Sequence, residues 1–234
     1  MSLQVFAFRP EPGLSQTLVR ARQMGLEVIG CPLFEIRPVP WRPPEAGAFD
    51  ALLVGSANVF RHGGEGLTAL NTLPVHAVGE TTAELARMSG FDVASVGQGG
   101  LDTVVRALPD TSQRLLRLSG RERVDLTPRG NIEVTERIVY EAAPLPLSSS
   151  CAKTLREGGI AMLHSAAAAR QFASECGSHN LPRDRIAIAA LGPRIAETAG
   201  ACWRSVRSAP MPEDGALLAL VREMWQDLRG GSAA

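Results

Sequence analysis

The sequence predicts an α/β protein built from two parallel-sheet units. Short apolar runs of strand length alternate with amphipathic stretches of helix length, and motifs of the first half recur in the second. The length of 234 residues suits one to two domains with a sizeable core. With 24 Lys+Arg against 24 Asp+Glu and 45% hydrophobic residues, the composition is that of a globular protein.

In the first half, Ser56 is expected to begin a helix because serine is a favoured N-cap. Proline interrupts one extended segment at Cys31-Pro32, because it cannot donate to a strand ladder. Strands are expected at 3–8, 27–36, 49–54, 75–78 and 91–96, and further helices at 14–24, 81–88 and 102–108.

The second half repeats the alternation. Its last helix carries an apolar stripe that suits packing on a sheet, at Leu217, Leu218, Val221, Met224, Trp225 and Leu228. The other expected elements are strands at 114–118, 132–141, 160–163, 185–191 and 203–207, with helices at 152–157, 165–176 and 193–199.

Three pairs of segments support an internal repeat. Residues 77–86 align with 190–199, sharing Ala, Gly, Ala, Glu and Ala in register at an offset of 113. Val54-Gly55-Ser56-Ala57 likewise matches Leu163-His164-Ser165-Ala166, and Leu33-Phe34-Glu35 matches Val139-Tyr140-Glu141. Two similarly folded units follow from this repetition.

Several functional classes are disfavoured. No apolar run approaches the ~20 residues that span a bilayer, and no secretory leader precedes the first strand, so we expect a cytoplasmic protein. A pI near 6.9 argues against nucleic acid as a partner. The four cysteines are widely spaced and expected to be free thiols, and the histidines show no metal-ligand spacing.

The repeated strand-to-helix junctions suit anion binding. Each places Ser or Gly after an apolar strand, where backbone N–H groups and the positive end of a helix face a ligand. Four such junctions in a shared cleft would suit a molecule with several carboxylates or phosphates. The alternative is that Ser56, Thr81 or Thr82, and Ser165 only cap their helices.

Other motifs exclude common enzymes. No serine lies in a G-x-S-x-G elbow, and the glycine-rich stretches at 63–66 and 97–100 lack phosphate-loop and dinucleotide patterns. Tyr140, the only tyrosine, ends a long extended run; it could pack in the core or give a proton or hydrogen bond to a leaving hydroxyl.

At these residues the sequence resembles the uroporphyrinogen-III synthase family over nearly its whole length. The segments that carry the resemblance are Phe8-Arg9-Pro10, Cys31-Pro32-Leu33, Val54-Gly55-Ser56-Ala57-Asn58, Val78-Gly79-Glu80-Thr81-Thr82-Ala83, Val139-Tyr140-Glu141, His164-Ser165-Ala166 and Leu191-Gly192-Pro193. The resemblance implies two flavodoxin-like domains joined by a two-stranded connector. One would combine residues 1–36 with 144–234, the other would span 37–143, and the active site would lie in the cleft between them.

The implied reaction is cyclisation of hydroxymethylbilane, a linear tetrapyrrole with eight carboxylates, to uroporphyrinogen III. Water is lost, ring D is inverted, and no cofactor is used. The resemblance implies that Tyr140 assists departure of the ring A hydroxyl. Carboxylates would be bound by Ser56, Asn58, Thr82, Ser165 and the amides around Gly192, with Arg9 and Arg194 as ionic contacts.

We expect a monomer, which would make transient contact with the upstream bilane-forming enzyme. Two departures from the family pattern concern the site: Arg194-Ile195 replaces the usual Thr-Thr, and Phe8 replaces a usual Thr. Two alternatives are a non-catalytic two-domain protein that binds a polyanionic metabolite and a nucleotide-dependent enzyme, the latter disfavoured by the missing phosphate loop.

Overall fold

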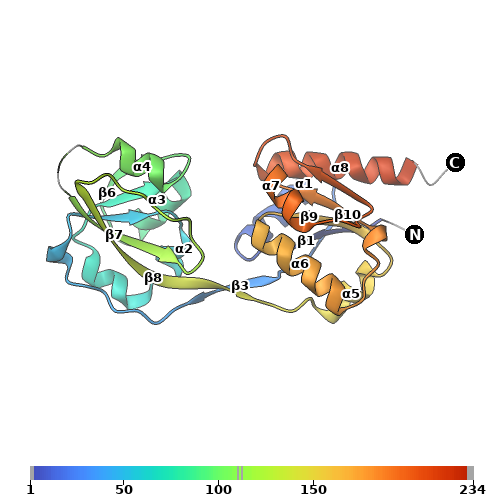
Figure 1. The fold of residues 1–234 in the computed structure, drawn as a ribbon, viewed down its shortest axis with the longest axis horizontal. Coiled ribbons are helices and arrows are strands. Elements are labelled where there is room, and N and C mark those ends of the chain that lie inside the picture. Colours follow the sequence, from blue (N-terminus) through green and yellow to red (C-terminus); the bar gives the residue numbers. More distant parts are fainter. Residues whose placement is uncertain (1–2, 110, 112, 231–234) are drawn as a thin grey trace. The chain divides into compact units, whose positions relative to one another are not determined.

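The computed structural model describes residues 3–109, 111 and 113–230. The chain divides into two compact units, unit 1 made of Met1–Glu35 with Pro144–Ala234 and unit 2 made of Ile36–Ala143. Each unit contains one sheet with helices on both faces (Figure 1). The predicted fold class is therefore confirmed.

In unit 1 a five-stranded parallel sheet has the order β11-β10-β9-β1-β2. The strands are β1 (Val5–Ala7), β2 (Val28–Gly30), β9 (Gly159–Leu163), β10 (Ile186–Ala190) and β11 (Ser205–Ser208). The central strands β9 and β10 are buried along their whole length, which explains why they are continuous apolar runs and not alternating ones.

Helices cover both faces of this sheet. On one face, α1 (Gly13–Gln23) and α8 (Asp214–Gly230) pack on residues such as Ala7 and Met162. On the other face the ring of Phe8 packs against the tilted ring of Phe172 of α6 (Ala166–Ser178). The remaining helices of unit 1 are α5 (Ser149–Leu155), α7 (Pro193–Ala199) and the 3-10 turn η3 (Arg183–Arg185).

Unit 2 contains a six-stranded sheet of order β3-β8-β7-β4-β5-β6. Its strands are β3 (Phe34–Pro38), β4 (Ala51–Val54), β5 (Val75–Val78), β6 (Val93–Gly97), β7 (Gln113–Gly120) and β8 (Ile132–Pro144). One face packs against α2 (Asn58–His62), η2 (Gly64–Leu70) and α3 (Glu80–Met88), and the other against α4 (Leu101–Ala107). A short turn, η1 (Ala46–Ala48), precedes β4.

The internal repeat explains the strand orders. Apart from β3, the strands of unit 2 have the order β8-β7-β4-β5-β6. This order matches β2-β1-β9-β10-β11 in unit 1, with β7 equivalent to β1 and β8 equivalent to β2. Both correspond to the flavodoxin-like order 2-1-3-4-5. Each half of the sequence therefore gives its first two strands to one unit and its last three to the other.

Strands β3 and β8 carry the chain between the units. The Val39 N–H donates to the Val139 carbonyl at 3.0 Å, and the Leu145 N–H to the Leu33 carbonyl at 2.8 Å, so the strands run antiparallel. The proline-rich passage after β3 belongs to unit 2, where the indole N–H of Trp41 donates to the Gly63 carbonyl at 2.8 Å.

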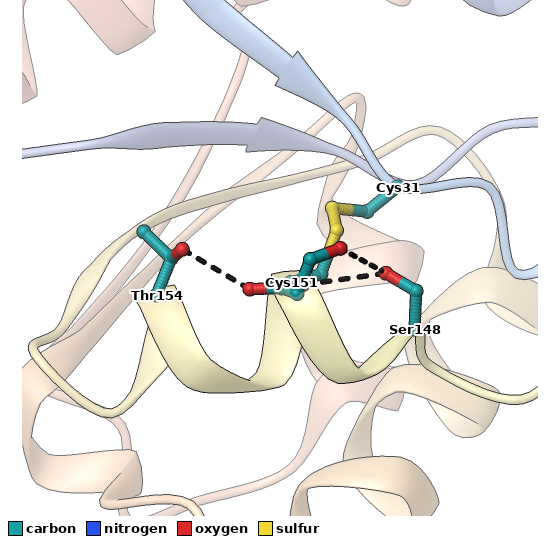
Figure 2. The surroundings of a disulfide bond; sticks show 5 residues. Cys31, Ser148, Cys151 and Thr154 are labelled. Carbon is teal, nitrogen blue, oxygen red and sulfur yellow. Dashed lines mark hydrogen bonds between the residues drawn. A yellow bond between two sulfur atoms is a disulfide. The ribbon is translucent and has the colours of Figure 1, made fainter.

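The cysteine prediction is wrong for one pair. Cys31, which follows β2, forms a disulfide with Cys151 of α5, with Cα atoms 6.4 Å apart (Figure 2). Ser148 positions Cys151 by accepting a hydrogen bond from its N–H as the N-cap of α5. Cys176 and Cys202 are free, and burial raises the pKa of the Cys176 thiol to about 12, so that this thiol stays protonated. The pairing was missed because only the fold brings residues 120 positions apart together.

Candidate functional site

A cavity of about 330 Å³ lies in unit 2 at the carboxyl ends of its strands. Open α/β sheets bind ligands at this edge because loops and helix starts converge there. Gly55 and Ser56 line it after β4, and Ser119 and Gly120 line it at the buried carboxyl end of β7. Tyr140 of β8 also lines it, so the structure brings two predicted site residues, Ser56 and Tyr140, into one cavity.

The position of Tyr140 depends on a glycine in the neighbouring strand. A Cβ atom built on Gly120 would lie 2.6 Å from the tyrosine Cε2 and 3.0 Å from its hydroxyl, so any larger residue would displace the ring. The register of β7 and β8 shifts at this point, between Ser119 and Gly120. On the other side, the ring of His62 lies 6.4 Å from the Tyr140 ring.

The other predicted residues of unit 2 do not line this cavity. Ser56 Oγ accepts a hydrogen bond from the Asn58 N–H at 3.2 Å, but the N-cap of α2 is Ala57, so Ser56 is not the helix cap that the sequence predicts. The Asn58 side chain accepts from the Arg61 guanidinium. Gly79, whose φ of 76° favours glycine, is the N-cap of α3, and Thr82 is buried in the first turn of this helix.

Arg117 and Glu136, on the neighbouring strands β7 and β8, form a partly buried ion pair that the sequence did not single out. The Arg117 Nη1 lies 2.6 Å from Glu136 Oε1, and Arg123 contacts the other carboxylate oxygen at 2.7 Å. Burial acts to raise the pKa of Glu136, but hydrogen bonds and charge from Arg123 and Arg117 outweigh it and lower this pKa. The carboxylate therefore stays ionised between two guanidinium groups.

Unit 1 contains a second polar network, centred on Asp214 at the start of α8. Asp214 Oδ1 accepts hydrogen bonds from the Thr17 hydroxyl at 2.9 Å and from the predicted substrate ligand Arg9 at 3.4 Å. His164, which follows β9, lies 2.9 Å from the same oxygen through Nε2. The guanidinium of Arg9 is thus already engaged inside its own unit.

Burial determines the charge state of this network. It lowers the pKa of His164, and nearby Arg9 adds to this effect against the hydrogen bond and charge of Asp214. The pKa of Asp214 is also lowered: burial opposes this, but hydrogen bonds from His164 and Thr17 outweigh burial. A neutral imidazole therefore faces an ionised carboxylate, and because the carboxylate only accepts, Nε2 carries the proton.

The remaining predicted residues lie at two helix starts of unit 1. Ser165 is the N-cap of α6, where its Oγ accepts from the Ala168 N–H at 3.1 Å. Gly192 is the N-cap of α7, and Arg194 is exposed in its first turn. Ser165 therefore has the capping role that was the alternative to carboxylate binding.

Two kinds of feature are absent from the described residues. No group of three or more His, Cys, Asp or Glu side chains among them could hold a metal ion. No helix in residues 3–109 and 113–230 is both long and apolar enough to cross a membrane.

Comparisons with known proteins bear on these sites. The family model described as uroporphyrinogen-III synthase HemD matches residues 15–219. The chain belongs to the uroporphyrinogen-III synthase family. This membership places it in tetrapyrrole biosynthesis, and none of the comparisons supports a non-catalytic binding protein.

Solved structures agree with the family assignment. A uroporphyrinogen-III synthetase from Helicobacter pylori superposes with a TM-score of 0.65 at 18% identity, over 95% of this chain and 100% of that chain. A mutant uroporphyrinogen III synthase from Thermus thermophilus gives 0.52 at 14% identity, over 96% and 99%. At these identities the likeness shows the synthase fold. A search of curated proteins gives no significant match.

Proposed function

We propose that this chain is a uroporphyrinogen-III synthase, a cyclising hydro-lyase that converts hydroxymethylbilane to uroporphyrinogen III. The family match over residues 15–219 carries the proposal. The cavity that holds Ser56 and Tyr140 together supports it, because it puts a phenol beside a hydroxyl and strand-end amides.

In this proposal Tyr140 acts on the hydroxyl of ring A. Its phenol donates a hydrogen bond to the departing oxygen, and water leaves as the ring becomes an azafulvene. Ring D then attacks through its substituted carbon, and the resulting spiro intermediate fragments and recloses with ring D inverted. The protein contributes by fixing the carboxylates so that the less reactive carbon meets the azafulvene, and by excluding water.

The carboxylate ligands proposed for this task are Ser56, Asn58, Thr82, Ser165, Gly192, Arg9 and Arg194. Helix starts and strand ends hold most of them, where N–H groups are available to anions. Tight binding then needs no basic surface, which fits a chain of zero formal charge.

In the test, hydroxymethylbilane is generated in situ and the purified protein is then added, without metal or nucleotide. The products are oxidised and the type I and type III uroporphyrin isomers separated by chromatography. We expect a shift to type III, whereas the uncatalysed bilane closes without inversion to type I. Heat-denatured protein is the control. Persistent type I from a sample with native circular dichroism would refute the proposed function.

A further inference from the structure

The connection between β7 and β8 differs from its counterpart in unit 1. There the chain passes from β1 to β2 through α1. In unit 2 residues 121–131, which we call the strap, make the equivalent connection and contain no helix. Parallel strands are usually joined through a helix. One face of the unit 2 sheet is therefore covered by α4 and the strap, where unit 1 has two helices, α8 and α1.

The strand register shows which residue stands under the strap. The repeated motif makes Leu53 of β4 equivalent to Met162 of β9. Met162 pairs with Ala7, whereas Leu53 pairs with Arg117. Arg117 therefore takes the position of an alanine that packs beneath a helix in unit 1. The long side chain of Arg117 therefore lies at the position that a helix covers in unit 1.

The same register places Ser119 at the position of Arg9, and two atoms here lack partners. Arg117 Nε and Ser119 Oγ are buried, with no hydrogen-bond partner in the described part of the chain. The two residues are 3% and 7% exposed, and both line the cavity with Tyr140. Buried polar atoms almost always have partners, so two in one cavity indicate that a ligand group supplies the missing contact.

The charges that line the cavity indicate which kind of ligand group would bind there. Arg117 and Arg123 share the single carboxylate of Glu136, which leaves one positive charge in excess within the cluster. A guanidinium N–H only donates, and the Ser119 hydroxyl can donate as well. The acidic residues of the lining, Asp102, Glu122 and Asp125, are more exposed than these two donors. The deep part of the cavity therefore suits an anionic acceptor.

We propose that this cavity receives one carboxylate side chain of the tetrapyrrole substrate, bound by Arg117 and Ser119. The inference rests on the proposed function and deepens it by adding a substrate-binding pocket to the Tyr140 side of unit 2. A carboxylate held here fixes the pyrrole ring that bears it close to the phenol. The Arg117 Nη2 also donates to the Val124 carbonyl at 2.7 Å, which holds the strap over the pocket.

The first test is Ser119→Ala, which removes a hydroxyl that has no protein partner and so leaves the fold intact. We expect KM for hydroxymethylbilane to rise about tenfold or more, because one hydrogen bond to a charged group is lost, with kcat changed less than about twofold. Ser89→Ala, at an exposed serine after α3 of the same unit, is the matched control and should keep wild-type constants.

A second test distinguishes substrate from a free anion. Sodium propionate is added to wild type and to Ser119→Ala, and the melting temperature and competitive inhibition are measured. We expect propionate to compete with the bilane more weakly in the variant. An unchanged KM in Ser119→Ala would overturn the inference, even if propionate stabilises wild type, because the pocket would then bind only a free carboxylate. Wild type that yields no type III isomer would instead refute the proposed function.

Discussion

At the residue scale, Tyr140 is the group whose chemistry is easiest to separate from its packing. Its ring joins the core of unit 2 beside Val139, while its hydroxyl faces the cavity region near Gly120. Tyr140→Phe keeps the ring and removes the proton donor. We expect kcat for type III formation to fall roughly tenfold or more, with KM little changed. Unchanged kcat, at an unchanged melting temperature, would remove the phenol from the mechanism.

His164 predicts a pH dependence of stability in unit 1. Its pKa is lowered in the folded chain by burial and by Arg9, while Asp214 at α8 opposes the shift and Arg20 of α1 lies 3.7 Å from Asp214. In the unfolded chain a histidine protonates near pH ~6.5, so below this pH the unfolded state binds more protons. Stability should therefore fall as pH drops from about 7 to 5. Asp214, whose pKa is also lowered, loses its contribution only at lower pH.

His164→Gln tests this prediction. It keeps a donor for Asp214 and removes the titrating group, so the fall in unfolding free energy between pH 7 and 5 should shrink by up to about 1.4 kcal/mol per pH unit. Amide hydrogen exchange of β9 and β10 reports on unit 1 directly. At pH 8 the imidazole is neutral in the folded and the unfolded state. The difference in unfolding free energy between the two proteins at this pH therefore gives the effect of the substitution apart from titration. Equal slopes in both proteins would contradict the prediction.

Residue-scale sequence reasoning pointed to positions at strand ends where a local motif existed. Ser56 and Tyr140 follow from strand-end patterns, and both line the cavity. Arg117 and Ser119 lie inside a strand pattern, and the binding role proposed for them is argued from a missing helix and from the register with β4. The disulfide likewise depends on residues that only folding brings together.

At the element scale, the ends of helices were predicted less well than their existence. The expected helix from 165 begins at Ala166 with Ser165 as its cap, as serine chemistry predicts. Helix α3 begins at Glu80, and its N-cap is Gly79, whose positive φ suits glycine, so neither Thr81 nor Thr82 caps this helix. The sequence of the strap has no periodic pattern. The difference at the cavity beneath it is recognised only when the β7–β8 connection is compared with the β1–β2 connection of unit 1.

Substitutions at Ser165 can separate its two possible roles, which are to cap α6 and to bind a substrate carboxylate. Aspartate caps a helix as well as serine does, but repels a carboxylate. If Ser165 binds substrate, Ser165→Asp should keep the melting temperature and raise KM about tenfold. Ser165→Ala should cost about 1 kcal/mol of stability through the lost cap. Ser148→Asp is the matched control, because Ser148 caps α5 in the same way. Wild-type KM in Ser165→Asp would leave Ser165 with a purely capping role.

At the scale of the whole molecule, the sequence order and the spatial order differ. Each unit takes strands from both halves of the repeat, so unit 1 is assembled from two segments separated by the whole of unit 2. The offset of 113 residues showed that a repeat exists, and the resemblance to the family indicated the discontinuous boundary. Unit 1 therefore pays a larger loop-closure entropy on folding than a continuous domain would.

The Cys31–Cys151 disulfide acts on this entropy, because it links the two segments of unit 1 across a separation of 120 residues. Cross-linking a loop of that length restricts the unfolded chain and stabilises the folded state by about 5 kcal/mol. We expect Cys31→Ser/Cys151→Ser to lower the stability of unit 1 by about this amount, as reduction with dithiothreitol should do in wild type. Cys202→Ser, at an exposed free cysteine, is the control. Thiol titration of the denatured, non-reduced protein should give two of its four cysteines as free. Four free thiols, or equal urea midpoints with and without reductant, would show that Cys31 and Cys151 contribute to stability through packing alone.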